Sequence, residues 1–348
     1  MSPTALSGGQ EEEIVLTEHL NAQYEMSVDA VDFLGGEVDR NYRIETSAGV
    51  TFLAKVQKDK DLRTLQWQEA ILVHLASRDA GVSMPTIVPT SDGRLHSRYS
   101  LKANTAIVSV HNWLSGTELI KLPSHSDSLL TDIGAKSASI TRALEGFDAP
   151  ALHQSHHWDV TRSDRAIRSC LDDHPQLAGE PYVRTVLEWF NEVQSKLTEL
   201  PRALVHHDLN DNNLLVDTND GQQHVSGVLD FNDALFSVRV AEPAIAGAYA
   251  MLRKEDPLRA LGLVVAGYQQ VQSLSADELE VVYPLAVARL CVQVLTLTAR
   301  SQSNPTEYGT RRMEHTLPAL GRLLEIEPAA ATTYLREARG DVAQAKVI

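Results

Sequence analysis

The sequence has little cysteine, no long apolar run and no internal repeat, and each of these absences excludes a class of protein. Two cysteines in 348 residues, Cys170 and Cys291, are too few for a disulfide framework, and their apolar neighbours indicate buried thiols. No apolar run reaches the length of about 18 residues that a membrane-spanning helix needs. The opening residues, "MSPTALSGGQEEE", lack the basic and apolar regions of a signal peptide. We therefore predict a cytoplasmic protein with no membrane partner.

Positive charge is also scarce. The chain has 31 Lys and Arg against 46 Asp and Glu, which gives a formal net charge of −15. A strongly acidic surface repels phosphate backbones, so we expect no nucleic acid partner, whereas a small cationic substrate is weakly favoured. Hydrophobic residues make up 43% and charged residues 22%, which is typical of a globular protein.

The pattern of the chain predicts two lobes, because 348 residues exceed one ordinary core. Residues 1–13 are predicted to be a flexible tail, although an amphipathic helix is expected over 11–24. Alternating segments over 25–116 predict a small antiparallel sheet with one inserted helix. From about residue 124 the apolar spacing is helical. The prediction is thus an α+β fold, with an N-lobe over 14–116 and a mostly helical C-lobe over 117–348.

Short polar side chains are concentrated in "ALVHHDLNDNNLLVD", residues 203–217. Two apolar segments follow, and the strong turn signal Asp220-Gly221 between them predicts a β-hairpin. If the hairpin pairs about this turn, Asn213 faces Asp230, with their side chains about 5 Å apart. An amide oxygen and a carboxylate at that spacing suit Mg²⁺, which prefers oxygen ligands.

Asp208 lies on the loop that enters the first of these strands, five residues before Asn213. Taken singly, Asp208 and Asn213 are more typical of turns, Asp230 equally suits a cap, and His206 is more typical of a structural histidine that holds a loop. Together, Asp208, Asn213 and Asp230 match the arrangement used for phosphoryl transfer. One aspartate orients the attacking hydroxyl, while the asparagine and the second aspartate hold the metal.

A phosphoryl-transfer site also requires a lysine that contacts the nucleotide and a carboxylate that holds this lysine. "TFLAKVQ" places Lys55 on a predicted strand, and Glu69 lies in the helix that follows. Alone, each residue is more typical of a solvated surface; together they fit the lysine–glutamate ion pair of kinases.

Two further stretches are candidates for nucleotide contacts. Gly35-Gly36 precedes the strand of Lys55 and fits either a simple turn or a loop that covers phosphates, although the sequence has no G-x-G-x-x-G motif. Backbone groups near His111 and Asn112, at the end of "VSVHNWLSG", are candidates to bind the nucleotide base.

On these residues the chain resembles the aminoglycoside phosphotransferase and choline kinase superfamily, and most of all its hydroxylysine kinase group. "HHDLNDNNLLV" is similar to the catalytic loop, and "VSGVLDFNDALFSVRVAEPAIAGAYAML" is similar to the metal segment and the next helix. The resemblance extends over nearly the whole chain from about residue 14. It implies a protein-kinase-like fold, Asp208 as the catalytic aspartate, Asn213 and Asp230 as Mg²⁺ ligands, and Lys55 as the nucleotide lysine, with ATP or GTP as phosphoryl donor.

The chain departs from this group at two positions, where His207 and Asn232 replace residues that are usually glycine. Glycine at such places often serves backbone angles that other residues avoid. Asparagine tolerates these angles better than most residues, which makes His207 the more unusual change.

The acceptor is expected to be a small cationic molecule with a hydroxyl group. Candidates to bind its ammonium are three acids near the site and one aromatic face, namely Asp211, Asp233, Glu242 and Trp158. Trp158 equally fits the core, and Asp233 and Glu242 equally fit caps of the helix near Pro243.

Arg289 lies in an apolar helix, so its charge must be paired with a carboxylate. The partner is either a protein acid such as Glu242 or a carboxylate of the substrate.

The sequence thus predicts a kinase that phosphorylates an amino alcohol or a hydroxy amino acid, such as hydroxylysine, ethanolamine or aminopropanol. Aminoglycoside, homoserine and choline-type phosphotransferases are alternatives with the same chemistry. A catalytically inactive nucleotide-binding regulator is an alternative from another class, which the retention of Asp208, Asn213, Asp230 and Lys55 disfavours. The resemblance also suggests a downstream phospholyase of the same pathway as a partner.

Overall fold

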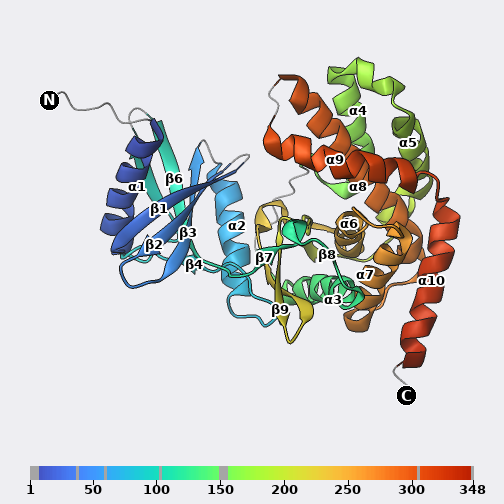
Figure 1. Cartoon of the computed structure of the whole chain (residues 1–348), viewed down its shortest axis with the longest axis horizontal. Helices are drawn as coiled ribbons and strands as arrows, with labels where there is room; N and C mark the ends of the chain where they lie inside the picture. The colour runs from blue at the N-terminus through green and yellow to red at the C-terminus, as the bar shows by residue number, and fades with distance from the viewer. Residues whose placement is uncertain are drawn as a thin grey trace. The chain divides into compact units, whose positions relative to one another are not determined.

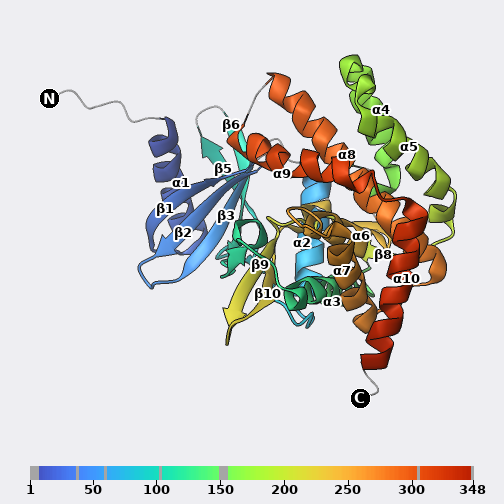
Figure 2. The same ribbon diagram turned by 45° about the vertical axis from the view of Figure 1, so that its right-hand side comes forward.

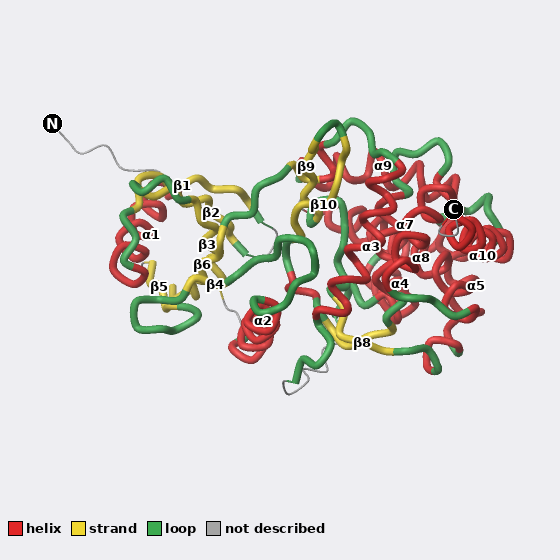
Figure 3. Tube along the Cα trace, turned by 90° about the horizontal axis from the view of Figure 1, so that it is seen from below, coloured by secondary structure: helices red, strands yellow, loops and turns green. Residues whose placement is uncertain are grey.

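The computed structural model describes residues 8–36, 39–58, 61–101, 104–148, 156–303 and 306–345. The chain forms two compact units, which are coloured by sequence in Figure 1. The first unit comprises Met1–Ser77 and Met84–Ser115, and the second comprises Arg78–Ser83 and Gly116–Ile348. The first unit contains a six-stranded sheet, and helices form most of the second unit (Figure 3), so the predicted α+β fold is confirmed.

The first unit is an antiparallel sheet with two helices. Its strands run in the order β1-β2-β3-β6-β4, and β5 pairs with β6. The elements are α1 (Gly8–Tyr24), β1 (Val28–Gly35), β2 (Arg40–Thr46), β3 (Thr51–Lys58), α2 (Leu62–Leu75), β4 (Ile87–Val88), β5 (Ser97–Leu101) and β6 (Asn104–Asn112). Leu16 and Leu20 of α1 pack on Tyr42 and Ile44 of β2, which explains the apolar spacing of both segments.

Helix α1 begins at Gly8, so the predicted flexible tail over residues 1–13 is too long. Tertiary contacts hold this first part of the helix. Glu12 is buried and pairs with Arg40 at 3.2 Å, and its backbone oxygen accepts a hydrogen bond from Tyr99 Oη at 3.1 Å. Residues 1–7 lie outside the described residues.

The second unit is built on helices that surround the apolar helix α8. Its helices are α3 (Asp127–Ala143), α4 (Ser163–Asp173), α5 (Pro181–Gln194), α6 (Ala241–Ala250), α7 (Pro257–Val271), α8 (Ala276–Ser303), α9 (Glu307–Leu323) and α10 (Pro328–Ala345). Its strands are β7 (Thr117–Glu118), β8 (Arg202–Val205), β9 (Leu214–Asn219), β10 (Gln222–Val228) and β11 (Leu235–Val238). Figure 2 shows the β9–β10 hairpin beside α3, where Asp132 accepts a hydrogen bond from the Val225 backbone at 2.7 Å.

Helix α8 is long and apolar enough to cross a membrane by length and composition alone. However, 94% of its most apolar stretch is buried inside the second unit. Helices α4, α5, α6, α9 and α10 pack on it, and Leu285, Val287 and Leu290 are among its fully buried residues. It is therefore the central core helix of this unit, and its one buried arginine, Arg289, requires a partner within the fold.

Candidate active site

The loop after β8 carries the predicted catalytic aspartate, and His206 fixes the start of this loop. The His206 side chain is fully buried. Its Nε2 donates to the Leu229 backbone oxygen at 2.8 Å, and its Nδ1 accepts from the Asp208 backbone N–H at 3.2 Å. Burial lowers the pKa of His206 to about 4, so the ring is neutral near pH 7. The structural interpretation of His206 is confirmed.

His207 occupies a left-handed backbone conformation, with φ of 66°. This is the conformation that favours glycine, the residue that the resemblance led us to expect at this position. Contacts on both sides of the residue offset the strain. Its backbone N–H donates to Glu242 Oε1 at 2.7 Å, and its buried Nε2 accepts from the Val160 N–H at 3.0 Å. Asn232 lies in a short 3-10 helix, Phe231–Asp233, without a positive φ, so its replacement of glycine causes no such strain.

The Asp208 carboxylate is held on both of its oxygens. Arg289 Nη2 donates to Oδ1 at 2.5 Å, and the side-chain amides of Asn213 and Asn210 donate to Oδ2 at 2.8 and 2.9 Å. The side chain is 17% exposed, so part of it remains open to an incoming group. Oδ2 already accepts two of these bonds and Oδ1 accepts one, so one lone pair on Oδ1 remains to accept an incoming hydroxyl.

Burial raises the pKa of Asp208 to about 7. The Arg289 charge opposes this rise, whereas the nearby carboxylates of Asp233 and Asp230 add to it. A carboxyl group that titrates near neutral pH is well suited to accept a proton from an alcohol during transfer.

Arg289 pairs with Asp208, the predicted catalytic aspartate, and the sequence did not indicate this pairing. We expected its partner to be either a protein acid such as Glu242 or a carboxylate of the substrate. The partner is a protein acid, namely Asp208. Nη1 also donates to the Trp158 backbone oxygen at 2.9 Å, and Nε donates to Tyr249 Oη at 3.2 Å. The guanidinium lies 4.7 Å from the centre of the Trp158 ring. Trp158 thus supplies the predicted cation–π face, but to Arg289.

The β9–β10 hairpin forms around Asp220-Gly221 as predicted, with both residues at positive φ. Its register differs from our expectation. The pairing next to the turn, Gln222 with Asn219, would set Asn213 opposite Val228. A β-bulge between Val225 and Gly227 moves this partner by one residue to Leu229, whose N–H donates to the Asn213 backbone oxygen at 2.8 Å. Asn213 therefore faces Leu229, and Asp230 follows one residue later in a left-handed conformation, with φ of 56°.

The Asn213 amide is oriented by Asp208. Its Nδ2 donates to Asp208 Oδ2 and to the Asp208 backbone oxygen at 2.9 Å, which turns Oδ1 away from these two atoms. Among the described residues, no group of three or more His, Cys, Asp or Glu is placed to hold a metal ion. The oxygens of Asn213 and Asp230 are of the type that Mg²⁺ prefers, and their role as its ligands stays a prediction.

Lys55 and Glu69 lie on β3 and α2 of the first unit, as predicted. Glu69 is buried, and its Oε1 accepts a hydrogen bond from His96 Nδ1 at 2.7 Å. Burial raises the pKa of Glu69, while His96 opposes the rise. His96 is a partner that the sequence did not indicate, because it lies in an irregular segment. The ion pair between Lys55 and Glu69 stays a prediction.

The two candidate nucleotide-contacting stretches are both defined in the first unit. Gly35 and Gly36 have φ of 94° and 140°, and a Cβ at Gly36 would meet the Asp39 backbone oxygen at 1.8 Å. These two glycines are thus required by the turn itself. The Asn112 N–H donates to the Thr86 backbone oxygen at 3.1 Å, and its Oδ1 accepts from the Thr86 N–H at 2.6 Å. The Asn112 N–H is thereby committed to Thr86, and His111 is buried in β6, so base binding by their backbones stays a prediction.

The sequence from residue 29 to residue 285 matches the model of the "Phosphotransferase enzyme family". The chain belongs to the phosphotransferase enzyme family. It is 26% identical to hydroxylysine kinase of Mus musculus over 287 residues. The aligned region covers 76% of this chain and 75% of the mouse protein.

Solved structures of phosphotransferases share the fold. The microcompartment-associated aminopropanol kinase has a TM-score of 0.67 at 19% identity, over 94% of this chain and 99% of that one. Amicoumacin kinase in complex with AMP-PNP and Ca²⁺ has a TM-score of 0.64 at 15% identity, over 90% and 93% of the two chains. The predicted protein-kinase-like fold and the resemblance to hydroxylysine kinases are both confirmed.

The three acids expected to bind an ammonium have different surroundings. Asp211 is buried and forms an ion pair with Arg312, and Glu242 is fully buried against the catalytic loop. Their partners make Asp211 and Glu242 supports of this loop rather than direct ligands of a substrate cation. Asp233 is partly exposed and close enough to raise the pKa of Asp208, so it stays our candidate for the ammonium.

We expect Asn213→Ala and Asp230→Ala to weaken Mg²⁺-dependent nucleotide binding by about tenfold or more, since even outer partners of metal ligands contribute 10- to 100-fold. Asp230→Ala should have the larger effect because it removes a charge. Calorimetric titration of nucleotide with Mg²⁺ and with EDTA measures the effect. Asn219→Ala, at the far end of the same hairpin, is the matched control. Equal affinities for wild type and both variants would rule out these ligands.

Glu242 makes stability depend on pH. Burial raises its pKa to about 8, although the backbone N–H groups of His207 and His206 oppose the rise. The carboxyl group titrates near 4.5 when the chain is unfolded, so between about pH 5 and 8 the unfolded chain releases this proton while the folded protein keeps it, and stability falls as pH rises. Glu242→Gln removes this dependence while keeping an acceptor for the His207 N–H. Between pH 5 and 8 the wild type should lose on the order of 3 kcal/mol more than the variant.

Thermal and urea denaturation at several pH values measure this difference. Glu188→Gln, at an exposed position on α5, is the control and should follow the wild type. Parallel stability curves for wild type and Glu242→Gln would show that Glu242 ionises in the folded protein without a penalty.

Proposed function

We propose that the protein transfers the γ-phosphoryl group of ATP or GTP to the hydroxyl of an amino alcohol or a hydroxy amino acid. The observation that carries this proposal is the arrangement of the catalytic loop. Asp208 is fixed by Arg289 and Asn213, and Asn213 directly precedes a hairpin whose second strand ends two residues before Asp230. Membership of the phosphotransferase enzyme family and the similarity to hydroxylysine kinase support the reaction class.

Each residue has a defined part in the proposed reaction. Asp208 orients the acceptor hydroxyl and takes its proton as the oxygen bonds to the γ-phosphorus and the nucleoside diphosphate leaves. Asn213 and Asp230 would hold Mg²⁺, which neutralises charge on the phosphates. Lys55, supported by Glu69, contributes to binding of the donor. Asp233 is our candidate to bind the acceptor ammonium.

A nucleotide-consumption screen tests the proposal. Purified protein with Mg²⁺ is offered ATP or GTP together with hydroxylysine, ethanolamine, aminopropanol, choline, homoserine or kanamycin, and the phosphorylated product is identified by mass spectrometry. We expect product with an amino alcohol or a hydroxy amino acid. Product with kanamycin or choline alone would favour the aminoglycoside or choline-type alternative. Hydrolysis at background level with every acceptor would contradict a kinase and favour a nucleotide-binding regulator. Cytoplasmic location and a downstream phospholyase stay predictions.

A further inference from the structure

A cluster of basic side chains lies next to the catalytic loop in the second unit. Asp211, three residues after Asp208, forms a buried ion pair with Arg312 of α9. Arg253, which follows α6, places its Nη2 at 4.0 Å from the other Asp211 oxygen. Two guanidinium groups thus converge on one carboxylate, and Asp211 is 2% exposed.

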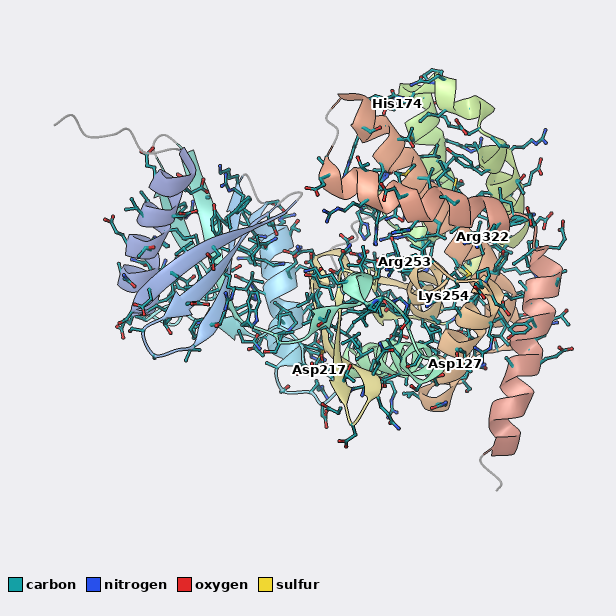
Figure 4. The ribbon with its side chains drawn as sticks, viewed as in Figure 1. Asp127, His174, Asp217, Arg253, Lys254 and Arg322 are labelled. Atoms are coloured by element: carbon teal, nitrogen blue, oxygen red, sulfur yellow. The ribbon has the colours of Figure 1, made fainter. Side chains whose placement is uncertain are left out.

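The neighbouring residues add to the positive charge. Lys254 is partly buried, and its pKa is lowered by burial and by the charge of Arg253. Burial, together with Lys254 and Arg253, lowers the pKa of His125 to about 4, so its ring is neutral near pH 7. Figure 4 labels Arg253 and Lys254 on the segment after α6, with Asp127 of α3 below them in this view. Asp127 opposes the lowering of the Lys254 pKa, so the charge for which an anion is inferred is that of Arg253, whose Nη2 lies 4.0 Å from Asp211.

The backbone and side chain of Arg253 are held in a defined position. Its φ of 60° lies in the left-handed region, which is strained for a residue other than glycine and often marks a functional site. Its Nη1 donates to the backbone oxygens of Ile120 at 3.0 Å and Leu122 at 3.5 Å. Its Nη2 is buried and has no hydrogen-bond partner among the described residues. A buried guanidinium nitrogen without a partner costs free energy that a bound anion would recover.

One aromatic ring connects this cluster to the catalytic aspartate. The guanidinium of Arg312 lies 5.0 Å from the centre of the Tyr249 ring, and that of Arg289 lies 5.9 Å from the same centre. Arg289 is the residue that holds Asp208. Tyr249 thus links Arg312 of this cluster to Arg289, which holds Asp208, by contacts within the second unit.

We propose that Arg253 and Arg312 form an anion subsite for the carboxylate of the acceptor, which makes the acceptor a hydroxy amino acid rather than an amino alcohol. This inference rests on the proposed kinase function. Guanidinium groups bind carboxylates through paired hydrogen bonds, and this geometry discriminates a carboxylate from a neutral group. A phosphate group of the donor has the same chemistry, so the test must separate these two anions.

The test compares acceptors that differ only in the carboxylate. Hydroxylysine is paired with 1,5-diaminopentan-2-ol, and homoserine is paired with 3-aminopropan-1-ol. Arg253→Gln should lower kcat/KM for the amino acids by about 10- to 100-fold, the range for a hydrogen bond to a charged group. The kcat/KM for the two amino alcohols and the KM for the nucleotide should not change. Arg253→Lys keeps the charge and should recover part of the loss.

Arg259→Gln is the matched control, since it removes a charge from an exposed pair with Asp127. If Arg253→Gln lowers kcat/KM equally for amino acids and amino alcohols, or for neither class, the proposed subsite is contradicted. A raised nucleotide KM with every acceptor would assign the anion to the donor phosphates and would also overturn it. If Arg253→Gln does not fold, the acceptor ratio measured on Arg253→Lys decides in the same way.

The wild type separates this inference from the function on which it rests. Phosphorylation of the amino alcohols but not of the amino acids would leave the kinase function intact and contradict the subsite. Phosphorylation of no acceptor at all would contradict the kinase function itself.

Discussion

Replacing Asp208 with alanine is expected to lower kcat by about 10²–10⁴-fold, the range for a positioned acid–base group. Asp208 is fixed by Arg289 on one oxygen and by Asn210 and Asn213 on the other, so a water molecule cannot take over its geometry. Nucleotide affinity should change little, because the aspartate acts on the acceptor hydroxyl. Steady-state turnover and nucleotide titration on the same preparation measure the two effects.

The alanine variant also leaves the buried Arg289 charge without its carboxylate, which lowers stability. Asp208→Asn separates the two effects, because its amide oxygen can still accept from Arg289 while the base is lost. It should be more stable than the alanine variant and similarly inactive. Asp217→Ala, on an exposed position of β9 labelled in Figure 4, is the control and should retain wild-type turnover. Near-normal turnover by the folded asparagine variant would mean that another group accepts the proton.

The elements of the fold were predictable where local pattern decides them. Helix α5 starts at Pro181 and buries Val183, Val186 and Phe190, as its spacing predicts. The hairpin turn at Asp220-Gly221 was equally clear. The start of α1 was not, because the contact of Glu12 with Arg40 joins segments that are distant in sequence.

The candidate site was predictable in its residues but less so in its contacts. Asp208, Asn213 and Asp230 stand at diagnostic offsets, whereas the bulge after Val225 leaves no clear trace in composition and shifts the register by one residue. The partner of Arg289 lies 81 residues away in the chain, and several acids in the sequence were equally plausible. The need for a partner followed from the apolar helix, but its identity required the fold.

Replacing Arg289 with methionine is expected to lower the free energy of unfolding by about 3–5 kcal/mol, as for a buried ion pair that loses one partner. Arg289 is 3% exposed, and the change leaves Asp208 without its Oδ1 donor and the Trp158 backbone oxygen without the donor from Nη1. The kcat should also fall, because Asp208 is no longer oriented from both sides. Chemical denaturation and turnover of the folded protein measure these effects separately.

Arg239→Met is the matched control on a second ion pair of α8. Arg239 donates to Glu278 Oε1 at 2.6 Å and to Oε2 at 2.8 Å, and Glu278 is fully buried. Its loss should lower stability in a similar way and leave kcat unchanged. A loss of kcat with Arg239→Met would show that destabilisation alone reduces turnover.

A double-mutant cycle of Arg289→Met with Asp208→Asn completes the test. If the two side chains stabilise each other, their effects on stability should deviate from additivity by about 0.5–3 kcal/mol. The preference for hydroxylysine over its decarboxylated analogue should not change with Arg289→Met, because the arginine is committed to a protein carboxylate. Additive effects would mean that the contact contributes nothing to stability. A changed preference would mean that Arg289 leaves Asp208 and binds the acceptor carboxylate, in place of Arg253 and Arg312.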